Sequence, residues 1–243
     1  MNAAGGALSG QVAIVTGAGR GIGHAIAMAL ARKAATVVLA ARTRQELAAA
    51  AAVIRESGGT ALAIPTDVTQ DAAVEAMVEQ ANAELGRVDI LVTAAGAASF
   101  GPVVGTKPAD WDAILAVNLR AVMACCRAVL PVMIRQHRGT IINIASVAAQ
   151  RPIPGAAVYT ATKAGVVGFS RVLAEELRGD GVRVGVLVPG AVDTPLWDTI
   201  GNSPDRSRML RPEDVARAAV LMASLPPGAS LEELTLMPAG GIL

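Results

Sequence analysis

Short apolar runs rich in β-branched residues alternate along the chain with longer segments in which apolar residues recur every three or four positions. The runs have the continuous hydrophobicity of buried strands, and the longer segments have the spacing of amphipathic helices. This alternation predicts an α/β fold: a doubly wound, mostly parallel seven-stranded sheet with helices on both faces. The predicted strands are 12–16, 35–41, 61–65, 89–95, 139–146, 182–190 and 232–238, and the predicted helices are 21–33, 44–57, 71–85, 109–134, 158–178 and 212–223.

The pattern continues without a shift in composition, which favours a single domain across residues 1–243. We find no low-complexity block, repeat period or linker-like segment, and this length is ordinary for one α/β domain. The stretch 201–208 is polar and rich in residues that break regular structure, so we expect a mobile loop there. It lies within a predicted substrate loop around 191–211.

The composition narrows the possible functions. The net charge is +1 and no basic cluster is present, so neither a nucleic acid nor a membrane is expected as a partner. Cys125 and Cys126 are adjacent and have no other cysteine to pair with, which indicates a reducing, cytoplasmic setting. Both are expected to be small buried helix residues, and no metal site is expected because suitably spaced ligands are missing. No uncharged apolar stretch reaches the ~18 residues of a membrane span.

The first predicted strand is followed directly by the sequence TGAGRGIG, residues 16–23. Gly17, Gly21 and Gly23 have the spacing G-x-x-x-G-x-G, which lets the backbone turn sharply and approach a pyrophosphate. The helix that begins there presents free N–H groups and the positive end of its dipole to such an anion. The alternative is a glycine-rich turn that only packs the helix on the strand, but its position in the first strand–helix turn favours a dinucleotide site.

The end of the second predicted strand indicates which dinucleotide binds. An acidic residue there would accept a hydrogen bond from the ribose 2′-OH and repel a 2′-phosphate. This chain has Ala41 at that place, Arg42 after it and Arg20 in the glycine loop, and two guanidinium groups without a carboxylate suit a 2′-phosphate. We therefore predict NADP rather than NAD; Arg42 would otherwise be a solvated residue that opens the next helix. Asp67 and Val68, after the third strand, are candidates to hold the adenine, unless Asp67 caps the following helix.

The sequence YTATK at 159–163 places the only tyrosine of the chain four residues before one of its three lysines. In a helix Tyr159 and Lys163 share one face, and an ammonium beside the phenol lowers a pKa that is ordinarily ~10. The pair is a candidate for proton transfer; the alternative is a half-buried tyrosine beside a lysine with a buried stem. Ser146 ends a predicted strand where doubly wound sheets bind ligands, and Asn118 stands inside a helical pattern although Asn is a poor helix former. Each of these two would otherwise be a capping or surface residue.

Taken together and in this order, these motifs resemble the short-chain dehydrogenase/reductase family. The match runs from Val12 to about Gly241 and rests on TGAGRGIG, DV at 67–68, TAAG at 93–96, Asn118, Ser146, YTATK and PGAVDTP at 189–195. The resemblance implies a Rossmann fold and hydride transfer between NADP(H) and a carbonyl compound or an alcohol. The cofactor contacts that we expect on these grounds are Gly17, Gly19, Arg20, Gly21, Ile22, Gly23, Ala41, Arg42, Thr43, Asp67, Val68, Ala94, Ala95, Gly96, Tyr159, Lys163, Pro189, Gly190, Val192 and Thr194.

The resemblance also implies a role for each residue of the predicted catalytic group. Tyr159 would be the general acid in ketone reduction and the base in alcohol oxidation, and Ser146 would bond the carbonyl oxygen. Lys163 would bind the nicotinamide ribose and lower the tyrosine pKa, and Asn118 would hold a water that joins Lys163 to solvent. Thr93 departs from the family, which usually has an asparagine there that braces the central sheet. We expect the threonine to keep one such bond.

The sequence is less informative about the substrate. Residues that follow the strand ends are mostly small or apolar, and Trp197 among them is either a lid anchor or a packing residue. Gln150 and Arg151 are the polar exceptions, and Arg151 would either meet a carboxylate or phosphate or lie in solvent. We predict that the substrate contacts come from Ser146, Val147, Gln150, Arg151, Ala191 and Trp197.

We predict an NADP-dependent carbonyl reductase or secondary-alcohol dehydrogenase. The C-terminal sequence ASLEELTLMPAGG differs from the T-G-Q and D/N-G-G pattern usual in 3-oxoacyl-carrier-protein reductases. It looks more like dehydrogenases that act on small hydroxy acids, amino-acid side-chain alcohols and general carbonyls. Reduction of acyl thioesters is the second interpretation, and a non-catalytic NADP sensor, which commonly lacks the tyrosine or lysine, is a third. The sequence also leaves imine reduction and epimerisation open. The resemblance implies a homotetramer, or a dimer, built through helices 109–134 and 158–178 and the last helix and strand.

Overall fold

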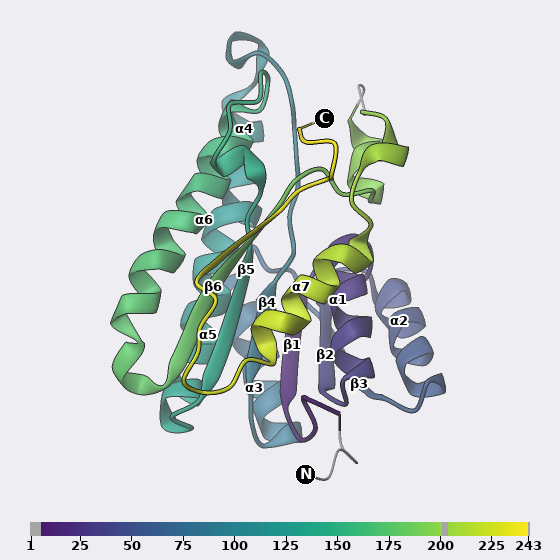
Figure 1. The fold of residues 1–243 in the computed structure, drawn as a ribbon, viewed down its shortest axis with the longest axis vertical. Coiled ribbons are helices and arrows are strands. Elements are labelled where there is room, and N and C mark those ends of the chain that lie inside the picture. The colour runs from purple at the N-terminus through teal and green to yellow at the C-terminus, as the bar shows by residue number, and fades with distance from the viewer. Residues whose placement is uncertain (1–5, 201–203, 243) are drawn as a thin grey trace.

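The structure is a computed structural model in which residues 6–200 and 204–242 are described. Within these ranges one sheet of seven parallel strands has the order β3-β2-β1-β4-β5-β6-β7 (Figure 1). The predicted single-domain, doubly wound α/β fold is therefore confirmed. The strands are β1 (Val12–Thr16), β2 (Thr36–Ala41), β3 (Thr60–Pro65), β4 (Ile90–Thr93), β5 (Gly139–Ile144), β6 (Val182–Pro189) and β7 (Glu233–Leu236).

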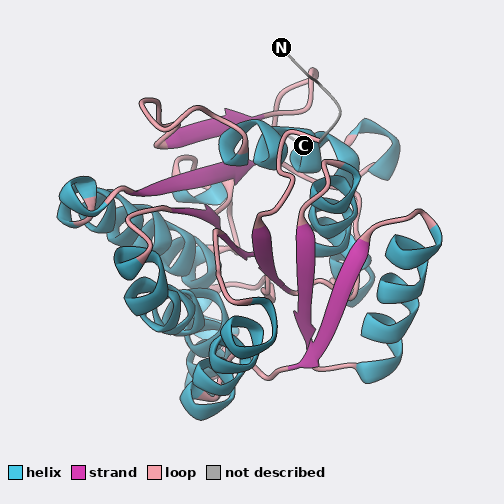
Figure 2. Cartoon of the chain, turned by 90° about the horizontal axis from the view of Figure 1, so that it is seen from below, coloured by secondary structure: helices cyan, strands magenta, loops and turns pink. Residues whose placement is uncertain are grey.

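Helices cover both faces of the sheet (Figure 2). On one face the apolar side chains of α1, α2 and α7 form a core cluster with the strands, and on the other face those of α3, α5 and α6 form a second cluster. Both clusters consist almost wholly of Ala, Val, Leu, Ile and Met, because the chain has few aromatic residues. These helices are α1 (Gly21–Arg32), α2 (Arg44–Glu56), α3 (Asp71–Leu85), α5 (Ala121–Arg135), α6 (Ala157–Glu176) and α7 (Pro212–Ala223).

The predicted helix 109–134 is interrupted in the structure, and the prediction is wrong in that respect. α4 (Pro108–Leu115) continues into a π-helical turn, Ala116–Arg120, before α5 begins. Hydrophobic spacing alone does not reveal one extra residue in a turn. Such π turns frequently occur at functional sites, and this one contains Asn118.

The helical stretch Pro108–Arg135 contains an 18-residue window with the mean hydropathy, 1.8, of a helix able to cross a membrane. It is not uncharged, because Arg120 and Arg127 interrupt it. Its inward side chains, including those of both cysteines, are buried in the core cluster that α5 forms with α3 and α6. The stretch is therefore a core helix of this fold. Cys125 and Cys126 are free and buried, as predicted, and burial raises the pKa of the Cys125 thiol to about 12.

The strand order produces a crevice between β1 and β4. The chain leaves β1 toward β2 and β3 on one side and then crosses to β4 on the other, so the direction of the strand order reverses between β1 and β4. Ligands of doubly wound sheets bind in such a crevice at the carboxyl ends of the strands. These ends face the top of Figure 1, where the segment after β6 and the C-terminal tail also lie.

The segment after β6 is anchored more firmly than we predict from its polar sequence. Residues 201–203 of the predicted mobile loop lie outside the described residues. Beyond them, the Arg206 guanidinium donates to Asp193 Oδ1 at 2.5 Å, to Asp198 Oδ1 at 2.6 Å and to the Thr194 carbonyl at 3.1 Å. Three hydrogen bonds from Arg206 therefore connect its part of the loop to the segment that directly follows β6.

The two central strands β4 and β5 are linked by buried side chains as well as by their backbones. The Thr93 hydroxyl donates to Asn143 Oδ1 at 2.7 Å, which confirms the bond expected of this threonine. Asn143 is fully buried, and its Nδ2 donates to Ser170 Oγ on α6 at 2.8 Å. The hydrogen bonds of Asn143 with Thr93 and Ser170 therefore connect β4, β5 and α6 directly beneath the crevice.

We expect Thr93→Val to lower the free energy of unfolding by about 1–3 kcal/mol, because a buried amide oxygen loses its hydroxyl donor. The side chain keeps its shape, so packing contributes little to the change. Urea unfolding followed by far-UV circular dichroism measures the effect. Thr60→Val, at an exposed position that begins β3, is the control and should change stability by less than ~0.5 kcal/mol. Equal stability of both variants would contradict the proposed bracing.

Candidate active site

A cleft of about 1310 Å³ opens at the carboxyl ends of the strands and is lined by the loops that follow β1 to β6. The described part of the chain holds no group of three His, Cys, Asp or Glu side chains that suits a metal ion. All residues that the sequence predicts to contact the cofactor lie in the lining of this cleft. They are Gly17, Gly19, Arg20, Gly21, Ile22, Gly23, Ala41, Arg42, Thr43, Asp67, Val68, Ala94, Ala95, Gly96, Tyr159, Lys163, Pro189, Gly190, Val192 and Thr194.

The glycine loop allows backbone segments to approach each other closely. A Cβ atom at Gly17, whose φ is +67°, would lie 2.8 Å from the backbone of Ala95, and one at Gly23 would lie 2.4 Å from the Gly17 carbonyl oxygen. The N–H groups of Ala94 and Ala95 donate to Thr16 Oγ1 at 3.1 and 3.3 Å, which holds the loop after β4 against the glycine loop. The N-terminus of α1 thus faces the open cleft, and this arrangement fits the pyrophosphate of a nicotinamide dinucleotide.

Two arginines line the end of the cleft beyond the glycine loop. Arg20 and Arg42 are both exposed there, on the loops after β1 and β2. Asp67 lies at the same end and accepts from the Thr69 N–H at 3.0 Å and from Thr69 Oγ1 at 2.8 Å. These bonds lower the pKa of the Asp67 carboxyl, with a smaller contribution from the charge of Arg42. Asp67 therefore stabilises the turn before α3, and Gln70 is the residue that precedes the helix.

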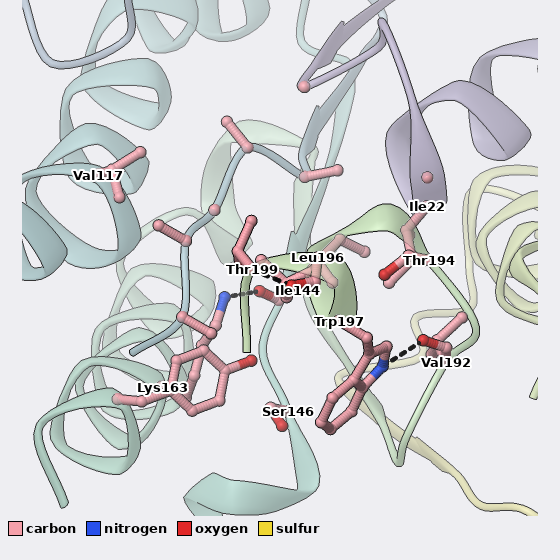
Figure 3. Close-up of a pocket in the computed structure, with 18 of the residues that line it drawn as sticks. Ile22, Val117, Ile144, Ser146, Lys163, Val192, Thr194, Leu196, Trp197 and Thr199 are labelled. Atoms are coloured by element: carbon pink, nitrogen blue, oxygen red, sulfur yellow. Dashed lines mark hydrogen bonds between the residues drawn. The ribbon is translucent and has the colours of Figure 1, made fainter. Parts of the chain in front are cut away.

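Ser146, Tyr159 and Lys163 come together on one wall of the cleft. Tyr159 and Lys163 lie one turn apart on α6, and Ser146 follows β5. The Ser146 hydroxyl is near enough to the Tyr159 phenol to lower its pKa. The Lys163 ammonium lies 5.8 Å from the centre of the phenol ring and donates to the Ile144 carbonyl at 3.0 Å (Figure 3).

Burial changes the proton affinity of both groups. It raises the pKa of the Tyr159 phenol, and the Ser146 hydroxyl opposes this change. The direction is opposite to the lowering that we predict from Lys163, because burial of the phenol is the largest influence. Burial also lowers the pKa of Lys163 to about 8. A phenol with a raised pKa keeps its proton at neutral pH but is a weaker acid than a free tyrosine.

Asn118 lies behind this wall and outside the lining of the cleft. It is fully buried, and its Oδ1 accepts from the Ala97 N–H while its Nδ2 donates to the Ala97 carbonyl, both at 2.8 Å. Nδ2 also donates to Thr162 Oγ1 at 3.3 Å. The amide therefore joins the loop after β4 to α6. The resemblance implies that Asn118 holds a water. Any such water would share a side-chain amide that already bonds Ala97 through both Oδ1 and Nδ2.

The predicted substrate contacts divide into two groups. Ser146, Val147, Ala191 and Trp197 line the cleft. Gln150 and Arg151 lie outside its lining, which corrects that part of the prediction. The short turn Val147–Ala149 carries the chain away from the cleft, and Gln150 Nε2 then donates to Glu233 Oε1 at 2.5 Å on β7.

Several residues that line the cleft are absent from the prediction, among them Glu46, Met237 and Ile242. Glu46 lies on α2, and a Cβ atom at Gly19 would lie 2.6 Å from its Oε2. Its position in the first turn of α2, four residues after Arg42, is the signal that could have suggested it. Met237 and Ile242 come from the C-terminal tail, whose return to the cleft no local pattern indicates.

Comparison with known proteins identifies the family. The family model described as short chain dehydrogenase matches residues 11–205. A 3-oxoacyl-[acyl-carrier-protein] reductase of Synechocystis is 37% identical, over 98% of each chain. The crystal structure of a metagenomic short-chain oxidoreductase in complex with NADP has a TM-score of 0.85 and 40% identity, and covers 96% of this chain and 99% of that one. A 3-ketoacyl-(acyl-carrier-protein) reductase from Brucella melitensis complexed with NADH has a TM-score of 0.88 and 34% identity, over 96% and 98%.

The fold and the site together define a nicotinamide-dependent oxidoreductase that acts on small molecules. The chain belongs to the short-chain dehydrogenase/reductase family.

Lys163 leads to a prediction about stability, because its side chain is only 5% exposed. Below pH ~8 it carries its proton in the folded and in the unfolded state, so the cost of burying the charge is fully present. Between pH ~8 and ~10.5 the folded state loses the proton first, and stability rises with pH. We expect Lys163→Met to raise the free energy of unfolding by about 1–3 kcal/mol at pH 7, and the gain should shrink toward pH ~10.

Urea unfolding of both proteins at pH 7 and at pH 10 measures this difference. Lys33→Met, at an exposed position after α1, is the control and should show no such pH dependence. A less stable Lys163→Met protein at pH 7 would contradict the expectation.

Proposed function

We propose that the protein is an NADP(H)-dependent carbonyl reductase that also catalyses the reverse oxidation of a secondary alcohol. The observation that carries this proposal is the cluster of Ser146, Tyr159 and Lys163 in a cleft that fits a dinucleotide. All three are present, whereas a non-catalytic sensor has no need of them. The proposed domain spans residues 1–243, with the substrate loop around 191–211.

The chain's own residues would handle the proton and orient the substrate. When bound, the reduced nicotinamide supplies the hydride, which adds with its electron pair to the carbonyl carbon. The Tyr159 O–H donates its proton to the carbonyl oxygen, and the Ser146 hydroxyl donates a hydrogen bond to that same oxygen. Lys163 would hold the ribose and restore the proton of Tyr159. Asn118 would act as a positioning residue that keeps α6 and the loop after β4 in register.

The choice of NADP is supported by the charge at the far end of the cleft. Ala41 stands where a carboxylate would exclude a 2′-phosphate, and Arg20 and Arg42 are exposed beside it. Glu46 lies at the same end and opposes a phosphate, so the preference depends on the two guanidinium groups. One of the similar structures carries NADP and another carries NADH, and the argument therefore rests on these residues.

We expect Arg42→Ala to weaken NADPH binding about 10-fold, because a phosphate loses a charge-assisted hydrogen bond, and to change NADH binding less than ~2-fold. Fluorescence titration with each cofactor measures both affinities. Arg44→Ala is the matched control, since Arg44 is exposed but outside the cleft lining. The double change Ala41→Asp with Arg42→Ala should reverse the preference. If the unchanged protein binds NADH as tightly as NADPH, the assignment of NADP as the cofactor is wrong.

We expect Tyr159→Phe to reduce carbonyl turnover about 10³-fold, because the proton donor is lost, while NADPH binding changes little. NADPH oxidation is measured over ketones, keto esters, keto acids and acetoacetyl thioesters. Retained turnover in the variant would refute the role of Tyr159, and no turnover of any substrate by the unchanged protein would favour the sensor.

Reduction of a 3-oxoacyl thioester is the second candidate function. The 37% identity with the Synechocystis 3-oxoacyl-[acyl-carrier-protein] reductase over nearly the whole chain favours it. Its chemistry at Ser146, Tyr159 and Lys163 would be the same. A strong preference for acetoacetyl thioesters in the turnover measurements would make it the first candidate.

The proposal includes a homotetrameric assembly and a cytoplasmic location. Leu115 and Met123, near the two ends of the π turn, and Val172 on α6 are exposed apolar side chains, which supports a homotetramer built through these helices. The two unpaired cysteines support a reducing, cytoplasmic location.

A further inference from the structure

Three of the five aromatic residues of the chain meet at the substrate end of the cleft. Phe100 comes from the loop after β4, Tyr159 from α6 and Trp197 from the short helix Pro195–Thr199 after β6. The Phe100 ring meets the Tyr159 ring edge to face, with centroids 5.9 Å apart. It lies nearly parallel to the Trp197 indole, at 22° and 6.3 Å. All three line the cleft and are partly exposed in it.

These rings form a continuous wall that begins at the proton donor. Their spacing is that of rings in direct contact, so the substrate would pack against the wall and not between its members. The indole Nε1 donates to the Val192 carbonyl at 2.8 Å (Figure 3), which fixes the plane of the ring and uses its only donor. Trp197 and Phe100 therefore offer the substrate flat apolar surface and no hydrogen bond.

The charged side chains that line the described part of the cleft do not belong to this aromatic wall. Among the described lining residues, Arg20, Arg42, Glu46 and Asp67 lie at the far, dinucleotide end, and the Lys163 ammonium is bonded to the Ile144 carbonyl. The remaining lining of the substrate end is apolar or small, and includes Leu196, Ile153 and Met237. A substrate carboxylate or phosphate would lose water there without gaining a cation.

We propose, on the basis of the proposed carbonyl reduction, that the substrate class is uncharged aryl alkyl ketones and the matching 1-aryl alcohols. The carbonyl oxygen is held at the Tyr159 and Ser146 hydroxyls, and the aryl group attached to the carbonyl packs on Phe100 and Trp197. The chain builds its core almost without aromatic residues. Their gathering at this wall is thus an arrangement that packing of the fold does not require.

The test compares two ketones that differ only in the ring, acetophenone and cyclohexyl methyl ketone, with NADPH as the reductant. Phe100→Leu keeps an apolar side chain of similar size but removes the ring. We expect it to raise KM for acetophenone roughly 3- to 10-fold more than it raises KM for cyclohexyl methyl ketone. Phe169→Leu, which changes the other phenylalanine outside the cleft lining, should leave both KM values unchanged.

A second pair of variants distinguishes loss of the aromatic ring from a local folding defect. Trp197→Leu should raise KM for acetophenone as Phe100→Leu does, and Trp197→Phe should restore most of the loss, because it returns a ring without the indole N–H. Equal effects of Phe100→Leu on the two ketones would overturn the aryl assignment, as would a preference of the unchanged protein for acetoacetyl thioesters or charged keto acids. With equal effects or a preference for keto acids, Tyr159-dependent reduction would still support the proposed function, whereas a preference for acetoacetyl thioesters would make the second candidate function the first. Absence of Tyr159-dependent turnover with every carbonyl would overturn the proposed function itself.

Discussion

The hydrogen bond from the Lys163 ammonium to the carbonyl of Ile144 is the contact on which the site depends. Ile144 is the last residue of β5, so this bond ties α6 to the central sheet two residues before Ser146. The phenol lies one turn away on the same helix, and its distance from the ammonium follows from that attachment. One carbonyl replaces only part of the hydration of a buried ammonium. The group that aligns the site is thus held in place by the surrounding fold, at a cost in stability that is typical of functional sites.

Most of the fold follows from the sequence, because each strand and helix carries its own periodicity. Boundaries agree closely even for β7, and the glycine loop and the Tyr159–Lys163 pair are motifs whose own residues lie within a few positions of one another. What the sequence does not predict depends on contacts between distant segments. The π turn around Asn118 adds no hydrophobic signal, and Gln150 turns to Glu233, 83 residues away. The pKa of Tyr159 likewise depends on burial, which spacing along the chain does not reveal.

The two ends of the cleft are built on different physical principles. At the dinucleotide end, the N-terminus of α1 and exposed charged side chains line the cleft, and glycines let backbone segments approach each other closely. At the substrate end, apolar surface from three separate elements meets two hydroxyls. The loop that carries Trp197 is fixed by the Val192 carbonyl on one side and by Arg206 on the other. The wall is therefore largely formed before a substrate arrives, which limits the entropy lost on binding.

The C-terminal tail has a consequence for how the protein is handled in the laboratory. Met237 and Ile242 line the cleft, so a purification tag or a fusion partner added to the C-terminal tail would be attached close to it. The chain enters β1 at Val12, at the end of the strands opposite the cleft (Figure 1). An added sequence on the N-terminal side is accordingly the choice that leaves access to the cleft undisturbed.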